Sequence, residues 1–146
     1  MTRAFGIVFL LMATCLASFA RRESDEEVRA KADAATGSDK AELCMKVADR
    51  ELKVTLEAYK ANKPDQGRAA LEQIVKYSDA AHLAAIDSGK KLKRTEIKIR
   101  KIAEHLHDLR LNAEPDDQPI IQNAVDKLQE FRTELLKSMF GSKNHD

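Results

Sequence analysis

The chain is expected to fold as an all-α protein, because of its composition, the spacing of its apolar residues and its lack of strand-like runs. Charged residues make up 34% of the sequence and aromatic residues 5%, with five Gly and three Pro. Such a composition is typical of long helices and helical bundles. Strands require runs of β-branched and aromatic residues, and the one long uninterrupted apolar run stands at the N-terminus.

Length and charge limit the number of domains and the kinds of partner. A chain of 146 residues fits a single domain. The formal net charge is +1, so the chain as a whole has no charge bias toward nucleic acid or toward an acidic partner. Any electrostatic recognition must therefore be local.

Residues 1–20 have the parts of a secretory signal peptide. They begin with a positive charge, residues 4–20 contain no charged side chain, and the small residues Ser18 and Ala20 close the segment. This pattern predicts cleavage after Ala20 and export to a periplasmic or extracellular compartment. Two alternatives stay open: residues 4–20 could serve as an uncleaved membrane anchor, or Cys15 could carry a lipid.

Cleavage would leave a mature chain of residues 21–146 with a single cysteine, Cys44. Arg3 is the one charged residue lost, so 24 Lys and Arg would face 24 Asp and Glu. An exported protein with one cysteine has no internal disulfide, and its fold must depend on packing. We interpret Cys44 as a small apolar residue on a helix face; an intermolecular disulfide and a reactive thiol are the alternatives.

Residues 21–37 are expected to form a flexible leader. Residues 24–27 have the pattern of a helix capping box, but residues 28–35 offer one large apolar side chain, Val28. A helix with so little to bury is marginal in water. The leader should give way to a helical bundle domain that spans residues 38–141.

The first helix of this domain should run from about residue 38 to residue 61, because Pro64 prevents regular continuation. A short turn then leads to the next helix and makes an αα-hairpin. In its length and in the spacing of Tyr59, Pro64 and the pair Ala69-Ala70, this hairpin resembles a single tetratricopeptide unit. The likeness covers about 34 residues and does not repeat, so it implies no peptide-binding function. The apolar stripe of the first helix is Met45, Ala48, Leu52, Leu56 and Tyr59.

One long helix is expected over residues 66–111. Alternating steps of three and four residues from Leu71 to Leu109 meet no charged side chain, which is the a/d spacing of a coiled-coil seam. Asp-Ser-Gly at Gly89 is a reasonable helix end, but the seam stays in phase across it. We therefore expect a three-helix arrangement with a long central helix; a break at Gly89 would instead give a four-helix bundle.

Two prolines mark a linker at residues 112–119. The last helix should begin with Pro119 in its first turn and end at Gly141, and residues 142–146 should form a loose tail. The first and last helices are each about half as long as the central one, so each can pack on one half of it.

The sequence holds no motif that predicts an enzyme, a metal centre or a cofactor. Walker, Gly-x-Ser-x-Gly, Cys-x-x-Cys and His-Glu-x-x-His patterns are missing. His105 and His107 are two residues apart and would point to different sides of a helix, so they could not share a metal. We interpret the histidines, His82 included, as partly exposed residues on helix surfaces, and we expect no catalytic, cofactor-binding or metal-binding residue.

A basic run is the one candidate contact surface. At 100° per residue, its cations fall within an arc of about 180°, and Ile97 lies among them. An Ile surrounded by cations is what a helix that touches an anionic apolar surface would show. Alternatively, these side chains are solvated or pair with acids of the last helix. The candidate contact residues are Lys90, Lys91, Lys93, Arg94, Ile97, Lys98, Arg100 and Lys101.

These observations favour an exported, non-enzymatic helical-bundle protein that acts as a structural or protein–protein interaction module, with a protein partner or as a homodimer. The alternative is a peripheral envelope protein that binds anionic lipid or cell-wall polymer through the basic run. Nucleic acid is disfavoured as a partner, because the run lacks interleaved aromatic residues and the protein is expected to be exported.

Overall fold

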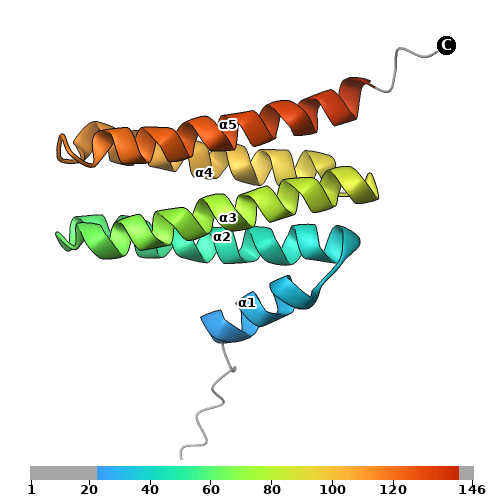
Figure 1. Ribbon diagram of the computed structural model, residues 1–146, viewed down its shortest axis with the longest axis horizontal. Helices are drawn as coiled ribbons and strands as arrows, with labels where there is room; N and C mark the ends of the chain where they lie inside the picture. Colours follow the sequence, from blue (N-terminus) through green and yellow to red (C-terminus); the bar gives the residue numbers. More distant parts are fainter. Residues whose placement is uncertain (1–22, 142–146) are drawn as a thin grey trace, which may run out of the picture.

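Five α-helices and no strands make up residues 23–141, which are the part of the chain that the computed structural model describes. This confirms the all-α class. The expected signal segment and loose tail lie outside the described residues. No helix within 23–141 is long and apolar enough to cross a membrane. The helices are α1 (Asp25–Ala34), α2 (Gly37–Lys60), α3 (Pro64–Ser88), α4 (Leu92–Asn112) and α5 (Gln118–Phe140) (Figure 1).

Four of these helices form two hairpins that pack against each other. α2 packs along α3 and α4 packs along α5; the hairpins meet where α3 contacts α5 and α2 contacts α4 (Figure 1). Buried apolar residues from all five helices belong to one core. The arrangement is bundle-like: α2 lies along α3, the first half of the long stretch, and α5 lies along α4, the second half.

The apolar seam expected along residues 71–109 faces this core. Leu92 and Leu109, near its middle and at its end, are partly buried against the same cluster. The seam prediction therefore identified the inward side of both halves of the stretch. Its fully enclosed members are Leu71, Ile74, Ser78, Ala81, Ala85, Thr95, Ile99, Ile102 and Leu106.

The expectation of one continuous helix over residues 66–111 is wrong. α3 ends at Ser88, and both Gly89 (φ 65°) and Lys91 (φ 64°) adopt the left-handed conformation before α4 begins. The Gly89 amide donates to the Ile86 carbonyl, and the Ser88 hydroxyl accepts from the Lys90 amide. The helix break at Gly89, which the alternative four-helix arrangement required, is thus present. The three- and four-residue spacing of the seam is unbroken in the sequence because the three residues between Ser88 and Leu92 make a step of four.

Residues 25–34 form a packed helix, α1, where the sequence analysis expected a flexible leader. The capping box forms as predicted: the Glu27 amide donates to Ser24 Oγ and the Ser24 amide to Glu27 Oε2, both at 3.2 Å. Val28 and Ala32 are completely buried. The sequence pattern did not predict this helix because a short helix is marginal when alone. It becomes stable when its apolar side packs against a neighbouring helix.

Replacing Gly89 with Ala should lower the free energy of unfolding by about 1–2 kcal/mol, because a Cβ is strained at positive φ. Nothing lies within 4 Å of the added Cβ, so the effect would come from the backbone. Gly141→Ala is the matched control, since Gly141 has φ −73° and equally open surroundings; it should change stability by less than about 0.5 kcal/mol. Urea unfolding measures both, and equal effects would contradict the assignment.

Candidate functional site

The first turns of α4 carry the basic run that the sequence singled out. α4 turns its buried side toward the core, and the cations lie on the remaining surface. Lys90 and Lys91 precede the helix, so the helical arc applies only to the later members of the run. Ile97 and Lys98 are half-buried, whereas Lys90, Lys91, Lys93, Arg94, Arg100 and Lys101 are exposed.

One edge of the basic run is neutralised by acids of α2. Lys91 Nζ lies 3.1 Å from Glu42 Oε2, and Arg94 Nη2 lies 3.8 Å from Glu42 Oε1. Lys98 Nζ lies 3.3 Å from Asp49 Oδ2. The hydrogen bond from Lys91, and then its charge, lower the pKa of Glu42. Intramolecular pairing was one of our two interpretations; its acids come from α2 and not, as expected, from the last helix.

The opposite edge of α4 is joined to α5 by an ion pair in which α4 supplies the acid and α5 supplies the base. Glu96 of α4 is nearly buried and accepts from Arg132 Nε of α5 at 2.9 Å. Arg132 Nη2 lies 2.8 Å from the same Glu96 oxygen, Oε1. One edge of α4 therefore forms ion pairs with α2, and the other forms an ion pair with α5.

Four cations remain: three on α4 between these edges, and Lys90 just before the helix. Lys90, Lys93, Arg100 and Lys101, which we name the basic strip, have no acidic partner within residues 23–141. Ile97 belongs to the same outward side of α4 but is only half-exposed. Within the described residues, these four cations are therefore not engaged in ion pairs.

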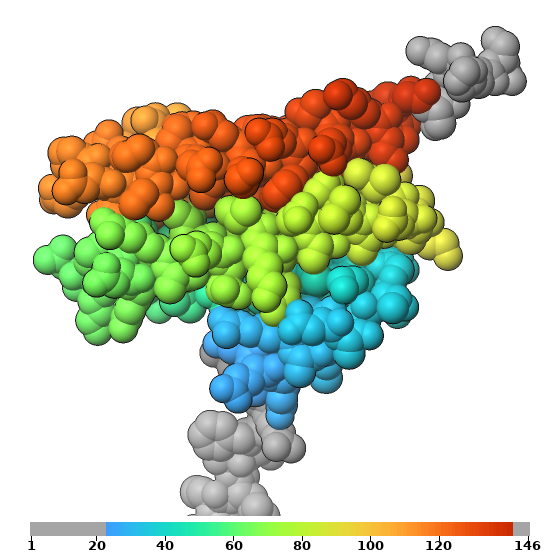
Figure 2. Space-filling model, viewed as in Figure 1, coloured from blue at the N-terminus to red at the C-terminus, as the bar shows by residue number. Residues whose placement is uncertain are grey.

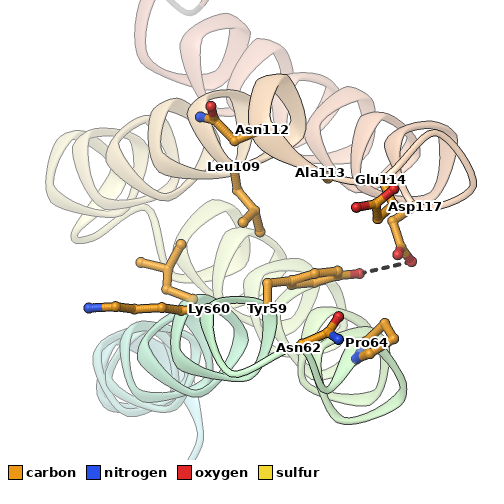
Figure 3. A pocket seen from close by; sticks show the side chains of 10 residues that line it. Tyr59, Lys60, Asn62, Pro64, Leu109, Asn112, Ala113, Glu114 and Asp117 are labelled. Atoms are coloured by element: carbon orange, nitrogen blue, oxygen red, sulfur yellow. Dashed lines mark hydrogen bonds between the residues drawn. The ribbon is translucent and has the colours of Figure 1, made fainter.

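A cavity of about 260 Å³ lies at the end of the molecule where the α2–α3 turn meets the α4–α5 connection (Figure 3). The Tyr59 ring points across it toward Asp117, and the Tyr59 hydroxyl donates to Asp117 Oδ1 at 3.4 Å (Figure 3). Leu56 and Leu109 form part of its apolar wall. The sequence did not reveal this site, because its residues come from separate ends of three helices.

Asp117 is the polar group at this cavity that is held most firmly. Arg68 Nε donates to Asp117 Oδ1 at 2.7 Å, and Asp117 is only 4% exposed. Asp117 occupies the N-cap position of α5, but its side chain makes no capping bond. A Cβ on Gly67 would lie 2.5 Å from Tyr59 Cε2, so this glycine makes room for the ring. The arrangement joins α3 to the start of α5.

His82 is not the surface residue that we expected. It is 2% exposed, its ring stacks on Phe131 at a centroid distance of 4.5 Å, and Nε2 lies 2.8 Å from Glu134 Oε2. Nδ1 lies 3.2 Å from Asp79 Oδ1. His82 therefore ties α3 to α5. It stands four residues after Ser78 and three before Ala85, both members of the seam, and this spacing could have placed it inward.

Within residues 23–141 no group of three or more His, Cys, Asp and Glu side chains is placed to hold a metal ion. Comparison of the chain with protein families, curated proteins and solved structures gives no match. Function must therefore be inferred from the geometry and from the sequence itself.

Both tyrosines should ionise above the ordinary pKa of 10. Burial raises the pKa of Tyr59 and of Tyr77, and the neighbouring carboxylates Asp117 and Asp33 raise them further. The phenolate absorbance of the folded protein should therefore rise only above pH 10, and in urea the midpoint should return to about 10. Stability should fall as pH rises through this range, because the unfolded chain releases these protons first. A native midpoint at or below 10 would contradict these environments of Tyr59 and Tyr77.

Proposed function

We propose that this protein is an exported, non-enzymatic interaction protein, built as a four-helix bundle with an additional N-terminal helix, that binds an acidic surface of a partner protein. The signal-like residues 1–20 support export. The observation that carries the proposal is the basic strip on α4. It is the part of the basic run that internal ion pairs leave available.

The strip suits recognition of an acidic protein surface. Its exposed side chains present several cations along one helix, and two of them, Arg100 and Lys101, are adjacent in sequence. Charge complementarity of this kind steers association and sets specificity. Pairing of Glu42 and Asp49 with the neighbouring cations also leaves those acids less free to compete for the strip.

Two features support a non-enzymatic function. Cys44 is buried, and burial raises the pKa of its thiol, whereas a catalytic thiol needs a lowered pKa. At the cavity beside Tyr59, the Asp117 carboxylate is engaged by the Tyr59 hydroxyl and by Arg68. Neither arrangement provides an activated nucleophile with a base.

A second candidate partner is an anionic lipid or cell-wall polymer. Ile97 favours it, because an apolar side chain among cations suits the boundary between charged headgroups and acyl chains. Its half-buried position reduces the apolar area that it can offer. This candidate would make the protein a peripheral envelope protein.

Reversing Lys93, Arg100 and Lys101 to Glu should remove binding to the acidic partner. At about 1 kcal/mol for each cation near an anionic surface, affinity should fall by at least about 100-fold. The same protein with Lys53, Lys60 and Lys127 reversed is the control, because these exposed lysines lie on other helices and the net charge changes equally. Affinity capture from native envelope extract at low salt, read by mass spectrometry, compares the two variants with the wild type.

Co-sedimentation with phosphatidylglycerol vesicles and with purified cell-wall polymer separates the two candidates. Capture of one acidic protein that is lost only in the strip variant supports the protein partner. Strip-dependent sedimentation in the absence of other protein supports the lipid or polymer. Unchanged binding by the strip variant in every assay would contradict both.

A further inference from the structure

α1 covers one side of α2, and Tyr77 of α3 also reaches it through Asp33. It packs along α2 and, among the described helices, makes no contact with α4 or α5 (Figures 1 and 2). In the space-filling view it forms a distinct mass below the α2–α3 hairpin (Figure 2). Because the basic strip belongs to α4, a role for α1 is independent of the proposed function.

The surface beneath α1 can be identified from a single ion pair. Arg29 of α1 pairs with Glu51 of α2, which is only 5% exposed. Val47 and Cys44 stand four and seven residues before Glu51, so they lie on the same side of α2. Both are almost completely buried. Removing α1 would therefore expose Cys44, Val47 and Glu51.

α1 is held by few apolar groups and many polar ones. Val28 and Ala32 are its two buried residues. The remaining contacts are polar: Tyr77 Oη donates to Asp33 Oδ1 at 3.2 Å, Glu23 Oε2 accepts from Lys46 Nζ at 2.6 Å, and Asp25 Oδ1 accepts from Arg50 Nη1 at 2.8 Å. Exposed pairs of this kind stabilise weakly and are screened by salt.

The connection between α1 and α2 allows the helix to move as a unit. Ala35 and Thr36 are extended, and Gly37 at the start of α2 has φ 59°. A ten-residue helix is not stable in water without a surface to pack on. Helices with few buried contacts open locally while the remaining structure stays folded.

We propose that α1 is a strap that opens while the bundle of α2 to α5 remains folded, and that its opening exposes the Cys44 side of α2. The strap controls access to a surface that the closed protein hides. Cys44 is the free cysteine of the described residues, so its accessibility reports the open state directly.

Maleimide labelling of Cys44 tests the strap in the full chain, with Cys15→Ser so that one thiol remains. Val28→Ala should speed labelling under native conditions by about tenfold or more, because it removes the main apolar anchor of α1. Val125→Ala in α5 is the matched control: it truncates the same side chain at a buried site of the bundle. It should lower global stability and leave the labelling rate within about twofold.

A second comparison uses the ion pairs. Arg29→Gln should speed labelling, and raising the salt concentration should speed it in the wild type, whereas Arg132→Gln, which breaks the Glu96 pair between α4 and α5, should not. Equal acceleration by Val28→Ala and Val125→Ala would overturn the proposal. Labelling that rises with urea as steeply as global unfolding does, or that is undetectable in Val28→Ala before the bundle unfolds, would overturn it as well.

Discussion

The reversal of the chain between Gly89 and Lys91 is the constraint on which the rest of the structure depends. Two left-handed residues within three positions end α3 and turn the chain back, so that α4 runs toward the opposite end of the bundle (Figure 1). The seam faces inward on both sides of the interruption, with Ala85 before it and Ile99 after it completely buried. The α4–α5 hairpin can then close over the α2–α3 hairpin. Without the reversal, Ile74 and Ile102 could not share one core.

The reversal also determines how charge is distributed around α4. It places one edge of α4 beside α2, where Glu42 and Asp49 pair with Lys91, Arg94 and Lys98. The other edge meets Arg132 of α5 through Glu96. The basic strip is what these two edges leave. The basic run therefore has two parts: some of its cations form ion pairs within the protein, and the basic strip is available to a partner. Only the basic strip supports the proposed interaction.

Local patterns could be predicted from the sequence, whereas features set by tertiary context could not. The capping box at Ser24, Pro119 at the start of α5 and the inward seam follow from spacing alone. Continuity at Gly89 was misjudged because a three-residue turn preserves helical phase. Packing of α1 depends on a surface of α2 that no local pattern reveals. His82 contacts Glu134, 52 residues away in the sequence, and Asp117 contacts Arg68, 49 residues away. No local pattern predicts such contacts.

The distance between Glu72 and His105 tests the reversal most directly. Both side chains are exposed, and they stand at similar separations from Gly89 on α3 and α4. Spin labels at these positions, with the two native cysteines replaced, measure the distance by double electron–electron resonance. Helices folded back within one bundle should place the labels within about 30 Å. A continuous helix, at 1.5 Å per residue, would place them about 50 Å apart, and that result would contradict the structure.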